Sequence, residues 1–239
     1  MIVLRSALFN LLFFGFTVVV AVALAAPLPY RRINARRGVA FWARGVGWLL
    51  ERVVGIETEV RGAEHIPRGP AIVAAKHQSA WDTIMFHEIL PKPAYILKEE
   101  LRRIPLYGWL TQAMGSITVD RAGGGRALKK LVSDSRAALE RGQQLVIFPE
   151  GKRGAPGTRL PYQPGVAALY AQLDAAVVPV ALNSGLFWGR RSFIKRPGRV
   201  VVEFLPPIPP GLDRREMLAE LEERIETASA ALAADAGFG

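Results

Sequence analysis

The sequence predicts an α/β domain, with a mainly parallel β-sheet flanked by helices, behind an N-terminal membrane segment. Three observations support this prediction. Short apolar runs rich in β-branched residues recur along the chain, amphipathic helical patterns separate them, and one long uncharged stretch occupies the N-terminal region. Strands that alternate with helices favour a parallel sheet covered on both faces. A length of 239 residues without internal repeats suits a single globular domain.

The N-terminal stretch is long enough to cross a bilayer as a helix. The chain carries no charge from Ser6 to Tyr30, and we expect a helix over about residues 7–29, which matches a hydrocarbon core of roughly 30 Å. Positive charge is concentrated after this stretch, in Arg31, Arg32, Arg36 and Arg37. The positive-inside rule therefore places the rest of the chain on the cytoplasmic side.

Two features of this region admit alternatives. Residues 23–25 resemble the cleavage site of a secretory signal peptide, although the long apolar run and the position of the arginines favour a retained helix. Residues 39–54 form an amphipathic segment whose tryptophans beside arginines suit either the membrane interface or a helix packed on the domain. The two segments form either a spanning helix with a surface helix or a hairpin in one leaflet. We assign residues 1–54 to the membrane anchor and residues 55–239 to the globular domain.

Six runs in the globular domain are nearly continuous in apolar residues, as strands buried on both faces are. These candidate strands are residues 71–75, 95–97, 117–119, 145–148, 177–181 and 200–204. Apolar residues at helical spacing predict a helix over residues 126–140, and residues 213–216 (Asp-Arg-Arg-Glu) resemble a capping box that opens another. Because ligand sites of parallel sheets lie at the carboxyl ends of the strands, the loops after these strands form the candidate site.

The composition excludes several kinds of chemistry. The chain has no cysteine, which removes disulfides, thiolate metal sites and cysteine nucleophiles. Its three histidines show no metal-ligand spacing, so we expect neither a metal nor a bound cofactor. The 31 Lys and Arg against 21 Asp and Glu give a net charge of +10, which suits an anionic partner. The arginines gather beside the membrane segment and in strand-end loops, without a nucleic-acid-binding motif, so a bilayer is favoured over nucleic acid.

The loop after residues 71–75 carries His77 and Asp82. If His77 lies in the turn and Ser79 caps the following helix, Asp82 falls in the first helical turn, from where its carboxylate can reach back to the imidazole. A neutral histidine held by a carboxylate is the group needed to remove a proton from a hydroxyl. The alternative is a capping aspartate beside an incidental surface histidine. The other two histidines, His65 and His87, are weaker candidates.

Two more strand-end loops carry residues suited to a phosphate. After residues 145–148 the chain reads Pro-Glu-Gly-Lys-Arg (residues 149–153), where the glycine permits close backbone approach and the two cations can donate to a phosphate. After residues 117–119, Arg121 is a suitable bidentate partner for a phosphate monoester. Ordinary charged turns are the alternative interpretation of both loops.

Taken in order, these segments resemble the glycerolipid acyltransferase family, and in particular the PlsC-like lysophosphatidic acid acyltransferases of bacteria. The resemblance covers residues 58–204 and rests on four ordered blocks. They are His77-Gln-Ser-Ala-Trp-Asp82, a long block from Lys98 to Arg121, Phe148-Pro-Glu-Gly151, and Val178-Pro-Val180. One such block is weak evidence by itself, whereas four in the family's order are specific.

The resemblance implies the family's fold. It also implies direct transfer of an acyl group, from acyl-CoA or acyl-carrier protein, to the sn-2 hydroxyl of 1-acyl-sn-glycerol-3-phosphate, without an acyl-enzyme. By this resemblance His77 is the general base and Asp82 orients it. The implied ligands of the glycerol phosphate are Arg121, Glu150 and Gly151, with Lys98, Lys152 and Arg153 alongside. Pro179 is implied on the acyl-donor side.

Two positions depart from the family's pattern. Lys76 stands where these enzymes often have Asn, and Lys152 where Thr is usual. Both add positive charge, which we expect to alter the preference for head group or donor. Another acceptor stays open as an alternative: glycerol-3-phosphate, a lyso-ornithine lipid or another lysophospholipid. A non-enzymatic membrane or nucleic-acid-binding protein and an inactive scaffold are alternatives of another class, which the presence of both His77 and Asp82 disfavours.

Overall fold

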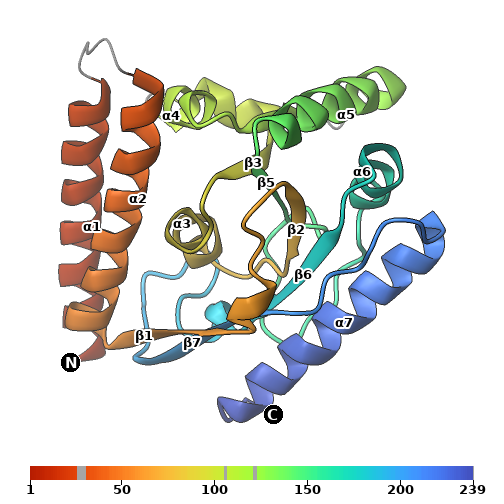
Figure 1. The fold of residues 1–239 in the computed structure, drawn as a ribbon. Helices are drawn as coiled ribbons and strands as arrows, with labels where there is room; N and C mark the ends of the chain where they lie inside the picture. The colour runs from red at the N-terminus through yellow and green to blue at the C-terminus, as the bar shows by residue number, and fades with distance from the viewer. Residues whose placement is uncertain (26–30, 105–106, 121–122, 239) are drawn as a thin grey trace.

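The computed structural model describes residues 1–25, 31–104, 107–120 and 123–238. Within these ranges, one sheet of seven strands forms the centre of the molecule, in the order β1-β7-β6-β2-β5-β3-β4 (Figure 1). The strands are β1 (Ile56–Arg61), β2 (Ala71–Ala75), β3 (Pro93–Lys98), β4 (Ile117–Val119), β5 (Gln144–Ile147), β6 (Val177–Leu182) and β7 (Gly198–Phe204). All neighbouring pairs are parallel except β6 and β7, so the predicted mainly parallel sheet is confirmed.

The burial of β2 shows why continuous apolar runs predicted strands correctly. Ile72 and Ala74 belong to the hydrophobic core on one face of the sheet, and Val73 and Ala75 to the core on the other face. Strand β1 was not predicted. It lies at the edge of the sheet and pairs, among the described strands, with β7 alone, so its polar side chains stay in solvent and no apolar run marks it.

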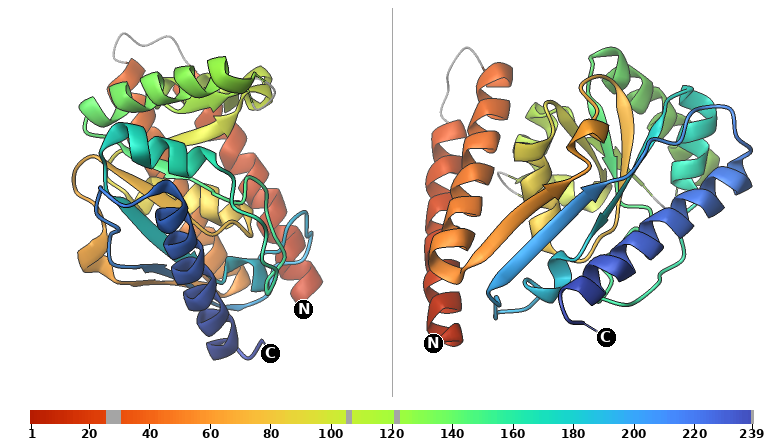
Figure 2. Two further views of the ribbon diagram at one scale, coloured as in Figure 1. Left: turned by 90° about the vertical axis from the view of Figure 1, so that its right-hand side faces the viewer. Right: turned by 60° about the horizontal axis from the view of Figure 1, so that its bottom comes forward.

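Helices cover both faces of the sheet (Figures 1 and 2). The helix α3 (Ala80–Ile89) packs with the N-terminal helices into one core, and α5 (Gly124–Glu140), α6 (Gly165–Leu173) and α7 (Arg214–Asp235) pack into the other. The shorter helices are α4 (Tyr107–Ala113), η2 (Ala63–His65), η3 (Glu99–Arg103) and η4 (Ser184–Leu186). The helix expected over residues 126–140 is confirmed as α5, and Asp213 caps α7 by accepting a hydrogen bond from Arg215 N at 2.8 Å.

Two antiparallel helices, α1 (Ile2–Ala25) and α2 (Arg31–Leu49), lie side by side at one edge of the molecule (Figure 1). A π-helical turn, η1 (Leu50–Val54), continues α2. Both helices begin earlier than expected, at residue 2 and not about 7, and at residue 31 and not 39. The arginines that interrupt the hydropathy pattern are good helix formers, so they end the apolar run but not the helix.

The helix α1 has one packed side and one exposed apolar side. Among the described residues, one stretch is long and apolar enough to cross a membrane, Ile2–Leu24, and only 11% of its most apolar window is buried. Phe9 on the packed side joins Val46, Leu50 and Trp188 in the core. The large apolar side chains left exposed include Leu4, Leu8, Leu11, Phe14, Val18, Val19 and Val22. The N-terminal hairpin is thus packed against the globular domain.

Candidate active site

His77 and Asp82 meet at the end of β2 in the arrangement that the sequence predicted. Ser79 has extended backbone angles and caps α3, so Asp82 lies in the first turn of that helix. Nδ1 of His77 lies 3.0 Å from Oδ2 of Asp82, and the same oxygen accepts bonds from the backbone N–H groups of Gln78 and Ser79 at 2.7 and 2.8 Å. The carboxylate is fully buried. The cap of α3 therefore fixes the partner of the imidazole.

The surroundings of His77 favour one neutral tautomer. An ionised carboxylate only accepts hydrogen bonds, so Nδ1 carries the proton and Nε2 keeps its lone pair. Among the described residues, no group is hydrogen-bonded to Nε2. The imidazole stacks on the ring of Phe148, with centroids 3.8 Å apart and planes 15° from parallel. The histidine thus has a fixed orientation with one basic nitrogen available.

Ser184 completes the surroundings of Asp82, and sequence reasoning missed it. It lies in η4, directly after β6, and its Oγ donates to Oδ1 of Asp82 at 2.5 Å. Nearby, Oε1 of Gln78 accepts a bond from Gly185 N at 3.0 Å. The position of Ser184 after a strand end was the available signal, because its distance of 102 residues from Asp82 leaves no local pattern.

Glu150 is hydrogen-bonded to the loop that carries His77. Its Oε2 accepts a bond from His77 N at 2.9 Å, and its Oε1 accepts one from Lys76 Nζ at 2.9 Å. The side chain is buried, and burial raises the pKa of the Glu150 carboxyl while the bond from Lys76 opposes that rise. We expected this carboxylate to contact glycerol phosphate; in the structure both of its oxygens are bonded by groups of the protein.

Lys76 is buried as well, and it joins the histidine loop to α7. Its Nζ donates to Oε1 and Oε2 of Glu226 at 2.7 and 2.9 Å and to the carbonyl oxygen of Thr158 at 3.0 Å. Tyr162 also donates to Glu226, at 3.1 Å. Only 2% of Lys76 is exposed. Its charge is therefore neutralised inside the protein. The expected effect of this lysine on head-group or donor preference stays a prediction.

The comparisons with known proteins agree with this geometry. The sequence profile of the Acyltransferase family matches residues 57–183. A 1-acyl-sn-glycerol-3-phosphate acyltransferase of Pseudomonas aeruginosa is 34% identical over 203 residues, which are 85% of this chain and 79% of that protein. The chain belongs to the acyltransferase family.

Further relatives of this acyltransferase occur in plants and animals. Enzymes of the same name from Limnanthes alba and, as the alpha form, from Homo sapiens are 30% and 31% identical over 187 and 163 residues. The chain spans 65% and 58% of their lengths. The crystal structure of the 1-acyl-sn-glycerophosphate acyltransferase PlsC from Thermotoga maritima superimposes with a TM-score of 0.78 at 22% identity, covering 97% of this chain and 98% of that one. The expected acyltransferase fold is thereby confirmed.

The other residues expected in the acyltransferase site lie at strand ends or within the sheet. Gly151 has a φ of 69°, a left-handed conformation that favours glycine, and it closes a tight turn with its N–H bonded to Phe148 O at 2.9 Å. Lys98 and Lys152 are exposed, and Arg153 is half-buried. Pro179 is buried within β6, opposite Ala74 of β2. The roles of these residues in substrate binding stay predictions.

Three other positions bear on the expected site. Arg121, expected to bind the phosphate, lies outside the described residues. His65 lies in η2 with Glu64 at 3.7 Å. Burial lowers the pKa of His87 to about 4, and its buried Nδ1 has no hydrogen-bond partner among the described residues. His77 is therefore the described histidine that combines a carboxylate partner with a free nitrogen.

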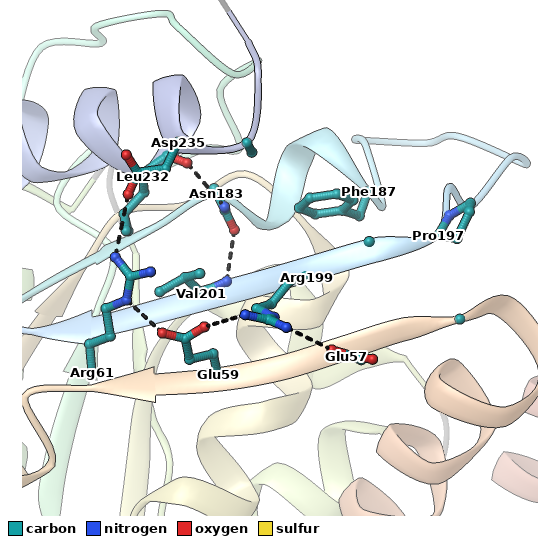
Figure 3. Close-up of a pocket in the computed structure, with 13 residues that line it drawn as sticks. Glu57, Glu59, Arg61, Asn183, Phe187, Pro197, Arg199, Val201, Leu232 and Asp235 are labelled. Atoms are coloured by element: carbon teal, nitrogen blue, oxygen red, sulfur yellow. Dashed lines mark hydrogen bonds and ion pairs between the residues drawn. The ribbon is translucent and has the colours of Figure 1, made fainter.

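A pocket of about 550 Å³ lies away from these residues, at the β1–β7 end of the sheet (Figure 3). Its charged side chains pair with one another: Arg61 with Glu59 at 2.7 Å and Asp235 at 3.5 Å, and Arg199 with Glu59 at 3.3 Å and Glu57 at 3.4 Å. None of the expected site residues lines it. This pocket is therefore separate from the expected site around His77.

Proposed function

We propose that this acyltransferase moves a fatty acyl group from an acyl thioester to the free sn-2 hydroxyl of 1-acyl-sn-glycerol-3-phosphate, forming phosphatidic acid. One observation carries the proposal: the buried Asp82 holds His77 with Nε2 available, at the carboxyl ends of the strands. The relatives named above share the name of this activity. Supply of phosphatidic acid places the enzyme in phospholipid synthesis.

The His77–Asp82 geometry supports direct transfer in two proton steps. Nε2 of His77 takes the proton of the acceptor hydroxyl as that oxygen attacks the thioester carbonyl. Asp82 stabilises the imidazolium that results, since its carboxylate faces the protonated Nδ1. When the tetrahedral intermediate collapses, the C–S bond breaks and the imidazolium returns the proton to the departing thiolate. The ester forms without a covalent enzyme intermediate and without a cofactor.

The basic residues around the strand ends are suited to the anionic substrate. We expect Lys98, Lys152 and Arg153 to attract the phosphate, together with the backbone of Gly151. Arg121, which lies outside the described residues, is expected to join them on the family resemblance alone. Arginine and lysine provide charge-assisted hydrogen bonds to phosphate oxygens. Glu150 positions the histidine loop by accepting a hydrogen bond from the backbone N–H of His77. Pro179 is proposed to shape the site on the side of the acyl donor. That donor is acyl-CoA or acyl-carrier protein.

The lipid acceptor agrees with the apolar helix α1, whose exposed side is suited to the membrane interior. Because arginines follow this helix, we place the catalytic domain at the cytoplasmic face. Membrane phospholipids and lysophosphatidic acid are then the molecules that the site meets. We propose no role in nucleic-acid binding.

The decisive experiment compares wild-type enzyme with His77→Ala in membranes. Each is given 1-acyl-sn-glycerol-3-phosphate, glycerol-3-phosphate or another lysophospholipid, with acyl-CoA and acyl-carrier protein as donors in turn. We expect phosphatidic acid from the wild type, and a loss of roughly 10²–10⁴ in rate in the variant, with unchanged folding by circular dichroism. Near-normal activity of His77→Ala would remove the assigned base, and preference for another acceptor would replace the substrate.

A further inference from the structure

The loop of residues 189–196, here called the basic loop, is bound to the N-terminal helix α1. Ser6 Oγ accepts a bond from Lys195 N at 3.0 Å and donates to Lys195 O at 3.3 Å. One turn further along α1, Asn10 Nδ2 donates to Phe193 O at 3.3 Å. Residues four apart share one face of a helix. Two of the few polar side chains of this apolar helix thus face the basic loop, which lies beside the N-terminal end of α1 (Figure 2, left).

Lys195 fastens the basic loop to the helix. It is only 3% exposed, and its Nζ donates to Asn10 Oδ1 at 2.6 Å and to the carbonyl oxygens of Phe193 and Ser192 at 3.1 and 3.3 Å. The same Nζ lies 5.5 Å from the ring of Phe9 and 5.2 Å from that of Trp188. Oxygens and aromatic faces solvate this cation in place of an acid. These contacts therefore fix the position of the basic loop along α1.

The side chains that the basic loop leaves exposed are of two kinds. Phe193 is 54% exposed, and Arg190, Arg191 and Arg196 are exposed around it. Among the described residues, no acid forms an ion pair with these three arginines. The segment has four basic residues and no acidic one. The helix α1, to which this loop is bound, also has exposed apolar side chains, among them Leu4, Leu8 and Leu11.

We propose that the basic loop is a lipid-contacting element that recognises the anionic surface of a phospholipid bilayer. Phe193 enters the head-group region, and Arg190, Arg191 and Arg196 meet lipid phosphates. Aromatic and basic side chains next to an apolar helix are the combination that an interface selects. Each arginine near an anionic surface favours membrane binding roughly five-fold. The proposal rests on the arrangement in which α1 and α2 form a hairpin in one leaflet, so that the N-terminal end of α1 lies at the same membrane face as the globular domain. It involves none of the catalytic residues.

The natural chain has no cysteine, so a single label can report the depth of the loop. Phe193→Cys and a control, Glu216→Cys, are labelled with bimane in the full-length protein. Glu216 is exposed in the first turn of α7, on the opposite side of the molecule from α1 (Figure 1). The proteins are placed in vesicles of phosphatidylcholine, or of phosphatidylcholine mixed with phosphatidylglycerol, with nitroxide-labelled lipids as quenchers.

We expect several-fold stronger quenching at position 193 than at position 216, and a further increase with phosphatidylglycerol. Equal quenching at both positions would overturn the proposal. Arg190→Gln, Arg191→Gln and Arg196→Gln together should abolish the response to phosphatidylglycerol while the Ser6–Lys195 bonds keep the loop in place. A retained response would overturn the assigned role of the arginines.

Two further outcomes separate this proposal from its alternatives. If the label at position 193 is shielded by an acidic carrier protein and not by lipid, the surface is a protein contact and the proposal fails. The labelled variants should keep their acyl-transfer rate in detergent, where no bilayer is present. Absence of acyl transfer in the wild-type enzyme would contradict the proposed function. The quenching measurement tests the lipid contact independently, because it does not require turnover.

Discussion

The hydroxyl of Ser184 donates a 2.5 Å hydrogen bond to Oδ1 of Asp82, the carboxylate oxygen that His77 does not use. Both groups are fully buried. Both oxygens of Asp82 are therefore held, Oδ1 by the Ser184 hydroxyl and Oδ2 by two backbone N–H groups and His77 Nδ1, which leaves the carboxylate a single orientation toward the imidazole.

Ser184→Ala should slow turnover without weakening substrate binding. The change leaves Oδ1 of Asp82 buried without this donor, at a cost of about 1–3 kcal/mol. We expect kcat to fall roughly ten-fold, corresponding to about 1.4 kcal/mol, with KM little changed. Ser184→Thr keeps the hydroxyl and should restore part of the rate. Steady-state kinetics on both variants check this, and an unchanged kcat in Ser184→Ala would show that Asp82 needs no second support.

Lys76 and Glu226 should be energetically coupled. In the wild type one cation faces two carboxylates, Glu150 and Glu226. Lys76→Met leaves two buried carboxylates together, and breaking a buried pair costs about 3–5 kcal/mol. Adding Glu226→Gln restores the wild-type net charge of the group, so the double variant should be more stable than the sum of the single changes predicts, by about 0.5–3 kcal/mol. Denaturant unfolding of the four proteins measures this, and strict additivity would contradict it.

Gly62 should be intolerant of a side chain. Its φ is +64°, and a Cβ built there would lie 2.0 Å from the carbonyl oxygen of Phe204. Left-handed backbone costs an L-residue about 1–2 kcal/mol, and overpacking adds about 1–3 kcal/mol. Gly62→Ala should therefore lower the free energy of unfolding by at least about 2 kcal/mol. Gly69→Ala is the matched control, because a Cβ there meets no atom within 4 Å. Equal stability of the two variants would exclude the clash.

Acid should destabilise the fold partly through His87. Burial lowers its pKa from 6.5 to about 4, so the imidazole is neutral in the folded protein over this range. Below pH 6.5 the unfolded chain binds a proton that the folded one refuses, so stability falls as pH drops from 6.5 toward 4 and is retained above 6.5. The two pKa values set an upper limit of about 3 kcal/mol on this loss.

His87→Phe removes the titrating group while keeping an aromatic ring beside Tyr95. The difference in unfolding free energy between wild type and variant should change with pH between about 6.5 and 4 and be constant above that range. Thermal or denaturant unfolding in detergent at a series of pH values gives this difference. A constant difference throughout would mean that His87 titrates normally in the folded protein.

Local patterns in the sequence were sufficient for much of the fold and for the centre of the site. Runs buried on both faces predicted β2, β5 and β6, because continuous apolarity follows directly from a covered sheet. The pairing of His77 with Asp82 was also predictable, since a helix cap brings together residues only five apart. The edge strand β1 was not, because a strand with a solvated side lacks such a run.

The support around the dyad could not be read from the sequence. Ser184 is 102 residues from Asp82, and Glu226 is 150 residues from Lys76. Such contacts are created by the sheet order and by the packing of α7, so neither partner carries a local signature. The extra lysine at position 76 was visible as a departure from the family, but its burial depended on a helix whose position the sequence did not reveal.

One short segment, residues 184–195, connects the N-terminal helix α1 to the His77–Asp82 pair. Near its start Ser184 bonds Asp82, and near its end Lys195 bonds Ser6 and Asn10 of α1. If α1 contacts lipid as proposed, a shift of this helix can be passed along the segment to Asp82, the proposed partner of the base. We therefore expect the turnover of this enzyme in vesicles to respond to bilayer thickness and curvature, which rate measurements across lipids of different chain length can test.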